Sequence, residues 1–170
     1  ATDEPETWFP QFFYAGCRYL QVDKIPAEPN GDLPQLEDLE GVVVHSTAEP
    51  IGDFKCSNEL VNRIRTLVRW AQRSNMVSVL TDCPHREKLG WLERSHGMGE
   101  AVHCEYDRLG PYRKQVADIL DAQEENGLVP DIAPEYVEFE GGFRDSPEWG
   151  SGGVVMPWLL YRWYGDRETL

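Results

Sequence analysis

The spacing of the apolar residues changes near Phe54, and this change constrains the fold more than any other feature of the sequence. Before Phe54, short aromatic and valine-rich runs, such as those around Tyr14 and Val43, are typical of β-strands. After Phe54, apolar residues recur at helical spacing from Leu60 to Ala71. The sequence therefore predicts a β-rich start followed by a mainly α-helical part.

The first 50 residues are too few to form a complete sheet. Aromatic residues flank Gly16 in a strand-rich stretch, and three prolines within Lys24–Glu40 predict a loop. A short strand is expected over Gly41–Ser46. We interpret residues 1–50 as the last strands of a β-domain that begins upstream.

Residues 51–170 contain four stretches with helical character. Ser57 or Asn58 can cap the first, and Asn126-Gly127 closes the third. The helices are expected to span residues 58–77, 90–103, 112–125 and 150–164. Helices in succession, joined by long loops, predict the opening hairpins of an all-α toroid.

Composition excludes several partners. With 16 basic and 30 acidic residues in 170, the net charge of −14 repels phosphate, so neither nucleic acid nor an anionic membrane surface is expected as a partner. No apolar run is long enough to cross a membrane. Six tryptophans and seven tyrosines beside many carboxylates suit sugar binding, although ordinary core aromatics would give the same counts.

The cysteines and histidines predict no metal site. The four cysteines contain no closely spaced pair, so we expect them to be free and mostly buried. His96 and His103 can share one helix face but lack a third ligand. The chain starts at Ala1 and ends at Leu170 directly after a helix-like stretch, and we expect it to be a fragment of a longer protein.

The densest polar cluster is the segment Asp82–Glu93, which lies in a loop between two expected helices. A buried or tryptophan-shielded Glu87 can keep its proton near neutral pH, as a general acid must. Trp91 follows four residues later and can cover the same pocket wall if a helical turn intervenes, and Arg86 can orient one carboxylate and keep it ionised. A solvated, salt-bridged loop is the alternative interpretation of the same residues.

The run Thr81–Trp91, TDCPHREKLGW, resembles the signature of the bacterial α-L-rhamnosidases of glycoside hydrolase family 78. Similar segments follow the family's order along most of the chain, among them Phe12–Val22, Phe54–Asn58, Trp149–Ser151 and Pro157–Tyr161. The resemblance implies an (α/α)6 barrel of six helical hairpins preceded by β-sandwich domains. Residues 1–50 would then be the C-terminal strands of a β-sandwich, and residues 51–170 the incomplete N-terminal part of the catalytic domain.

The resemblance also implies hydrolysis of terminal α-L-rhamnosides with inversion and without a cofactor. The expected partner is a rhamnose-containing glycoside or polysaccharide. Glu87 matches the family's general acid. The residues expected to bind substrate are Asp82, Arg86, Trp91, Glu93, Asp145 and Trp149.

Two departures from the family pattern bear on these assignments. Many members follow the tryptophan with a short residue, Gly and Asp, whereas this chain has Leu92-Glu93-Arg94, and we expect the acidic role to pass to Glu93. The family's general base lies further along than this chain extends, while inversion needs two carboxyls about 6.5–9.5 Å apart. We expect these 170 residues alone to be poorly stable and inactive, because an incomplete toroid leaves apolar helix faces uncovered.

Two further hypotheses remain open. The chain may instead be read as a carbohydrate-binding or structural module, in which the aromatic residues bind sugar and the Asp82–Glu93 loop only shapes a groove. It may also be read as another glycosidase on the same toroid with a different sugar specificity. Tyr136 and Phe139 are candidates for a rim that contacts the leaving group.

Overall fold

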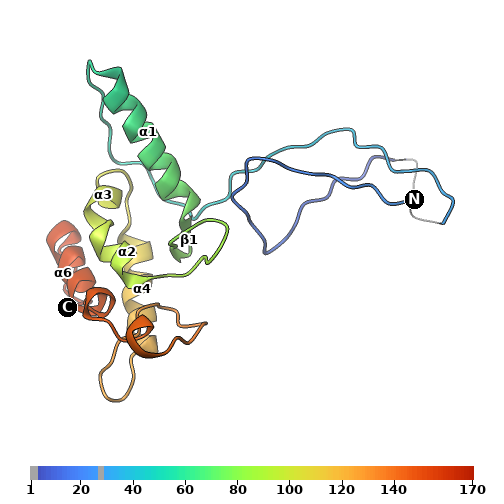
Figure 1. Cartoon of the computed structure of the whole chain (residues 1–170). Coiled ribbons are helices and arrows are strands. Elements are labelled where there is room, and N and C mark those ends of the chain that lie inside the picture. The colour runs from blue at the N-terminus through green and yellow to red at the C-terminus, as the bar shows by residue number, and fades with distance from the viewer. Residues whose placement is uncertain (1–3, 27–28) are drawn as a thin grey trace.

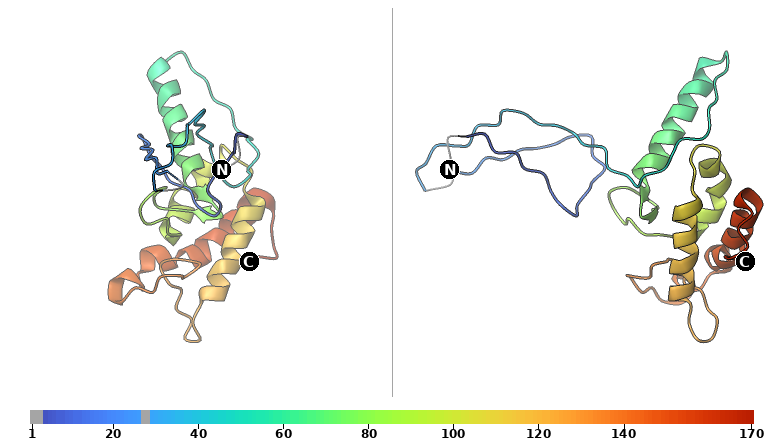
Figure 2. Two further views of the ribbon diagram at one scale, coloured as in Figure 1. Left: turned by 90° about the vertical axis from the view of Figure 1, so that its right-hand side faces the viewer. Right: turned by 180° about the vertical axis from the view of Figure 1, so that it is seen from behind.

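The computed structural model describes residues 4–26 and 29–170. Figure 1 shows the helices gathered at one end of the molecule, while residues 4–26 and 29–50 form a long extended segment that projects from them. The right-hand view in Figure 2 shows the same separation, with the C-terminus beside the helices. The prediction of a mainly helical chain is therefore confirmed.

Helix α1 (Glu59–Ser74) begins where the capping residue predicts. The Asn58 side chain accepts the backbone N–H of Leu60 at 3.0 Å, which satisfies one of the donors that a helix start leaves free. The helix ends before the expected Val77, because Met76–Val77 (β1) pairs antiparallel with Val79–Leu80 (β2). Ser78 makes this tight turn with a φ of 67°.

The helix expected over Gly90–His103 is two helices, α2 (Leu92–Gly97) and α3 (Gly99–His103). It starts late because the residues before Leu92 are extended: Trp91 forms a bridge with Ile132, and the Ala133 N–H donates to the Gly90 carbonyl at 3.3 Å. The break falls at Met98, between Gly97 and Gly99, where two glycines weaken helix formation.

The remaining helices pack side by side. Helix α4 (Leu109–Ala122) ends before the expected Glu125, because a turn closes there and Gly127 takes a φ of 90°. A single 3-10 turn, η1 (Gly141–Phe143), precedes α5 (Pro147–Gly150) and α6 (Gly152–Tyr164), so the expected fourth helix is divided at Ser151. Gly165 ends α6 in the left-handed conformation, with a φ of 67°.

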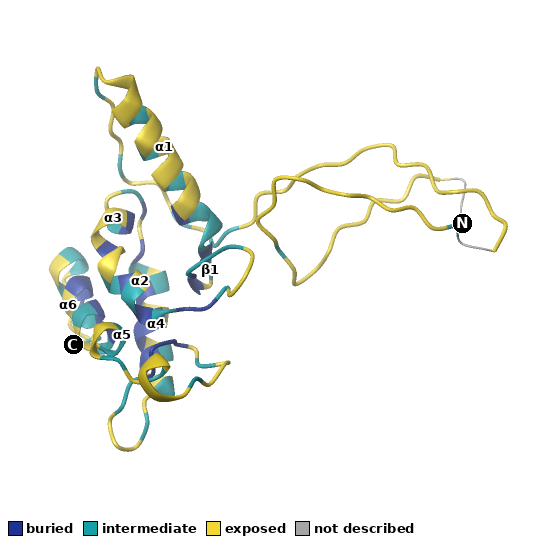
Figure 3. Cartoon of the chain, in the orientation of Figure 1, coloured by how far each residue is buried: buried dark blue, intermediate teal, exposed yellow. Residues whose placement is uncertain are grey.

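The core lies where the strand pair, α3, α4 and α6 meet, and Figure 3 shows buried residues concentrated on α4 and α6. It comprises Met76, Leu80, Val102, Tyr106, Tyr112, Val116, Met156, Leu159 and Leu160. A smaller cluster of Leu92, Ile119 and Ala133 joins α2 to α4. Leu60, Ile64 and Leu67 on α1 remain at least half exposed, as expected for an incompletely covered helix.

The strands expected within residues 1–50 are not formed: residues 4–26 and 29–49 contain none. A strand must pair its N–H and C=O groups with a neighbouring strand, and the described part of this segment offers no such ladder. Its aromatic side chains, such as Trp8, Phe9 and Tyr19, are exposed. Residues 1–3, 27 and 28 lie outside the described residues, and the assignment of residues 1–50 to a β-sandwich domain stays a prediction.

The cysteines are free, as predicted, but the expectation that most are buried is wrong. Cys17 and Cys104 are exposed, and Cys56 and Cys83 are partly buried. Cys83 is kept near the surface by the loop that carries Glu87, whose backbone N–H donates to the Cys83 sulfur at 3.0 Å.

Candidate active site

The loop between β2 and α2 is closed at its base by one carboxylate. The Asp82 N–H donates to the Leu89 carbonyl at 3.1 Å, and the Leu89 N–H donates to Asp82 Oδ1 at 2.9 Å. This reciprocal pair ties the two ends of the loop together. Asp82, predicted to bind substrate, is therefore already occupied on one oxygen by the backbone.

Glu87 lies between two donors from its own loop. Arg86 Nη2 is 2.9 Å from Glu87 Oε1, and the indole N–H of Trp91 donates to Glu87 Oε2 at 3.2 Å. The Glu87 side chain is 37% exposed and that of Arg86 is 76% exposed. Of the two expected settings for Glu87, burial is not found, because Arg86 approaches one oxygen from solvent, whereas Trp91 covers the other oxygen as the second setting requires. A carboxyl held in this way has a fixed orientation and can still be reached by a bound molecule.

Three aromatic rings from different segments meet at Trp91. The ring of Phe139 stacks on it at 5.3 Å between centroids and an interplanar angle of 25°, and Trp149 on α5 meets it edge-on at 6.1 Å. The antiparallel bridge between Trp91 and Ile132 fixes the backbone of Trp91. The structure thus brings Arg86, Glu87, Trp91 and Trp149 into one contiguous group.

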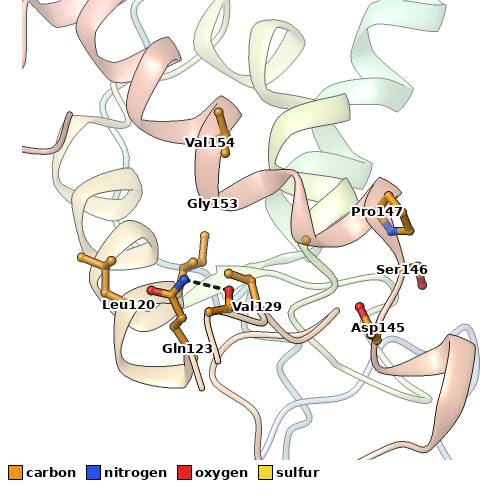
Figure 4. Close-up of a pocket in the computed structure, with 11 residues that line it drawn as sticks. Leu120, Gln123, Val129, Asp145, Ser146, Pro147, Gly153 and Val154 are labelled. Carbon is orange, nitrogen blue, oxygen red and sulfur yellow. Dashed lines mark hydrogen bonds between the residues drawn. The ribbon is translucent and has the colours of Figure 1, made fainter. Parts of the chain in front are cut away.

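Asp145 lies elsewhere. It lines an open cavity of about 340 Å³ between the end of α4 and the start of α6, together with Gln123, Ser146 and Pro147. Figure 4 shows Asp145 on the wall opposite Leu120 and Gln123. Neither Glu87 nor Trp91 lines this cavity, so the structure does not bring Asp145 to the Glu87 group.

Glu93 also points along its own helix. It forms an ion pair of 3.5 Å with Arg94 in the first turn of α2. Arg94 and Asp82 line a second cavity of about 310 Å³ between α1 and α2, which also contains the buried side chain of Gln72. Glu93 thus pairs with Arg94, whereas Glu87 is bonded to Arg86 and Trp91.

The sequence did not predict the buried hydrogen bonds between Asp131 and Ser146, the residue before α5. Asp131 is fully buried and accepts the Ser146 N–H at 2.9 Å and the Ser146 hydroxyl at 2.5 Å, which fixes the residue before α5.

Arg144 forms ion pairs with two carboxylates in the same region. It donates to both oxygens of Glu135, at 2.7 and 2.9 Å, and pairs with Glu124 at 2.5 Å. These bonds raise the pKa of Arg144, chiefly through Glu135. In sequence, the segment 128–149 shows only prolines, glycines and acidic residues, which do not reveal these partners.

Tyr14 and Tyr136 also approach the Glu87 loop. The Tyr136 hydroxyl donates to the Lys88 carbonyl at 2.6 Å, and the Lys88 ammonium donates to the Tyr14 carbonyl at 2.6 Å. Burial raises the pKa of both tyrosines, so both hydroxyls remain protonated at neutral pH. Tyr136 had a predicted place at the rim, whereas nothing in the sequence singled out Tyr14 or Lys88 for this contact.

Residues 4–26 and 29–170 hold neither a metal-binding cluster nor a membrane-spanning helix. No cluster of three or more His, Cys, Asp or Glu side chains in this part of the chain could hold a metal ion. None of its helices has the length and apolar character to cross a membrane.

Comparison with known proteins identifies a family whose model matches most of this chain. Residues 49–170 match the family model described as the bacterial alpha-L-rhamnosidase 6 hairpin glycosidase domain. An alpha-L-rhamnosidase of Streptomyces avermitilis is 32% identical over 166 residues, covering 97% of this chain and 15% of the relative. One from Formosa agariphila is 32% identical over 178 residues, covering 96% and 17%. The chain thus spans about a sixth of the length of these curated relatives.

Solved structures agree in fold. The alpha-L-rhamnosidase from Dictyoglumus thermophilum matches with a TM-score of 0.73 and 41% identity, covering 82% of this chain and 16% of that one. The Streptomyces avermitilis alpha-L-rhamnosidase complexed with L-rhamnose matches with a TM-score of 0.66 and 31% identity, covering 74% and 12%. The helices described above therefore correspond to part of a six-hairpin glycosidase domain.

Proposed function

Because the chain belongs to the family of bacterial alpha-L-rhamnosidases with a six-hairpin glycosidase domain, we propose that the protein hydrolyses glycosides that end in α-L-rhamnose. The observation that carries this proposal is the placement of Glu87, which is held by Arg86 and Trp91 and still open to a ligand. An L-rhamnose complex of a relative supports the choice of sugar.

Glu87 is the general acid of the proposed reaction. Its carboxyl gives a proton to the glycosidic oxygen as the bond from that oxygen to the anomeric carbon breaks, and the leaving group departs as an alcohol. The Trp91 N–H and the Arg86 guanidinium orient the carboxyl before transfer and stabilise the carboxylate that remains. Direct contact with a leaving group requires an accessible oxygen, which agrees with the partial exposure of Glu87.

The rhamnose subsite is proposed to lie against the aromatic group. The faces of Trp91 and Trp149 suit the apolar side of a pyranose, and Arg86 can bond its hydroxyls. Asp82 lines the cavity between α1 and α2 and is a candidate from the resemblance alone. Glu93 and Asp145 remain candidates from the resemblance alone, since Glu93 pairs with Arg94 and Asp145 lines a separate cavity.

The proposed stereochemical course is inversion. A water then attacks the anomeric carbon from the face opposite the leaving group, activated by a second carboxylate about 6.5–9.5 Å from the acid. We propose that this general base lies in a part of the full-length protein outside residues 1–170. Proton NMR of the first sugar released tests the course: β-L-rhamnose supports inversion, and α-L-rhamnose contradicts it.

The main test compares the full-length protein with its Glu87→Gln variant on a rhamnosyl disaccharide. A disaccharide is preferred because its poor leaving group needs the acid. We expect loss of about 10²–10⁴-fold in turnover. Glu125→Gln is the matched control, since this glutamate is exposed in the turn after α4.

Each other outcome has a definite meaning. Equal turnover in the wild type and Glu87→Gln would keep the hydrolase and overturn the role of Glu87. Sugar binding without hydrolysis by the wild type would favour the carbohydrate-binding module. Cleavage of a different terminal sugar in a substrate panel would favour a glycosidase of other specificity.

A further inference from the structure

Lys88, the residue after Glu87, has a backbone conformation that its surroundings must maintain. Its φ is 58°, in the left-handed region that few residues other than glycine adopt. Such a conformation persists where neighbouring contacts hold it. Because Lys88 shares a peptide bond with Glu87, whatever holds Lys88 also sets the direction in which Glu87 leaves the backbone.

The Lys88 side chain binds the N-terminal segment. Its ammonium donates to the Tyr14 carbonyl at 2.6 Å and lies 4.4 Å from the centre of the Tyr14 ring and 5.3 Å from that of Phe13. The segment is tied down again by the Gly16 N–H, which donates to the Pro84 carbonyl at 3.2 Å. A Cβ on residue 16 would lie 3.1 Å from the Pro84 ring, so the N-terminal segment and the Glu87 loop pack closely there.

The Lys88 backbone binds a third segment. Its carbonyl accepts the Tyr136 hydroxyl at 2.6 Å, from the loop that also carries Phe139. Lys88 therefore joins three parts of the chain: the N-terminal segment, the Glu87 loop and the 134–140 loop. The bonds between Asp82 and Leu89 close the base of the same loop, and Lys88 is the single residue between this closure and Glu87.

We propose that Lys88 is a positioning residue that holds Glu87 against Trp91 by anchoring the loop to Tyr14 and Tyr136. This inference rests on the proposed function, because it assumes that Glu87 is the acid. It also means that part of the support for the acid comes from before residue 49, where the family match begins.

The test uses the full-length protein with Lys88→Met, which keeps most of the side-chain length and removes the donor. We expect kcat/KM for a rhamnosyl disaccharide to fall about 10- to 100-fold, because small displacements of a catalytic group are costly. An aryl rhamnoside with a good leaving group, which needs little acid assistance, should lose less than about 3-fold. Lys88→Arg should recover most of the loss, and Lys55→Met, at an exposed lysine, is the matched control.

A second variant covers the case in which Lys88→Met does not fold. Tyr136→Phe removes only the hydroxyl that donates to Lys88, and we expect a smaller loss with the same preference for the disaccharide. Equal losses on both substrates, or no loss in either variant, would overturn the proposal.

A readout without substrate separates this proposal from the proposed function. Amide hydrogen exchange in peptides covering residues 13–20 and 82–91 should be faster in Lys88→Met than in the wild type. Unchanged exchange in both peptides would overturn the anchoring role, whatever the activity. If the wild type cleaves no rhamnoside and Lys88→Met still exchanges faster than the wild type in both peptides, the anchor is supported and the proposed reaction is rejected.

Discussion

The first 50 residues and the helices after residue 59 are both rich in large apolar side chains, yet only the helices bury them. Phe12, Tyr19 and Leu33 are exposed, whereas Tyr112 and Leu160 are fully buried. The difference arises from the backbone rather than from the side chains. A helix satisfies its N–H and C=O groups within one segment and needs a partner only for one face, whereas a strand needs a neighbour for every hydrogen bond. Apolar residues therefore form a core only where the backbone first has partners.

The largest expected contrast is in amide exchange. We expect the amides of α4 over residues 112–120 to exchange about 10-fold or more slowly than those of residues 9–25, because opening α4 requires disruption of the core. Hydrogen exchange with mass spectrometry on these 170 residues measures it. Comparable protection in both segments would mean that the strands form after all, and the comparison would fail.

A matched pair of leucines is the next contrast. Leu160→Ala removes a side chain with 0% exposure, and we expect it to lower the free energy of unfolding by about 2–5 kcal/mol. Leu33→Ala, in the exposed segment, should change it by less than about 0.5 kcal/mol. Urea unfolding followed by circular dichroism compares the two variants. Equal shifts would contradict the assignment of Leu33 to an unpacked region.

A matched pair of glycines should give a smaller contrast. Gly165 ends α6 with a φ of 67°, and Gly165→Ala should cost about 1 kcal/mol through backbone strain, since nothing lies within 4 Å of the added Cβ. Gly41 is equally open but carries no left-handed φ, so Gly41→Ala should have almost no effect. The same urea titration distinguishes them, and a neutral Gly165→Ala would show that the end of α6 is not fixed.

The smallest expected effect is a pH dependence within the helices. Burial lowers the pKa of His103 below its ordinary 6.5, against a weaker opposing influence of Asp107. The folded protein therefore takes up the proton at lower pH than the unfolded chain. His103 leaves stability unchanged above about pH 6.5 and reduces it progressively as the pH falls below that value.

His103→Phe isolates this effect. The substitution keeps an aromatic ring against Trp163, which stacks on His103 at 4.3 Å with an interplanar angle of 7°. The drop in thermal midpoint between about pH 8 and about pH 5.5 should be smaller in the variant than in the wild type. An identical drop in both proteins would assign the pH dependence to other groups.

The local parts of the fold could be predicted from the sequence. The Asn58 cap and the Gly165 terminus were read from single residues whose backbone preferences are strong. The break at Met98 and the late start at Leu92 were missed, because they depend on pairing with Ile132 and Ala133, which lie far along the chain. Long-range pairing of this kind leaves little trace in local periodicity.

In the candidate site, too, local contacts could be predicted from the sequence and long-range contacts could not. Trp91 was expected near Glu87 from a spacing of four residues, and the two are in contact, although through a closed loop rather than a helical turn. The approach of Trp149 and the burial of Asp131 arise from tertiary packing and could not be read from their neighbours. The left-handed backbone at Lys88 could not be predicted from the sequence, because lysine is not a residue that favours this conformation.

The bond from Lys88 to Tyr14 ends on a main-chain carbonyl, and this has a consequence for domain exchange. Any residue at position 14 that keeps the path of the backbone can supply the same acceptor, whereas only an aromatic residue also keeps a ring beside the Lys88 ammonium. The path of the chain is therefore the stricter requirement at this position. A chimera joined at residue 49 would therefore keep every residue of the Glu87 loop and still lose the anchor, unless the grafted partner brings a carbonyl to the same place. Compatibility between such partners is better judged from backbone geometry than from sequence identity.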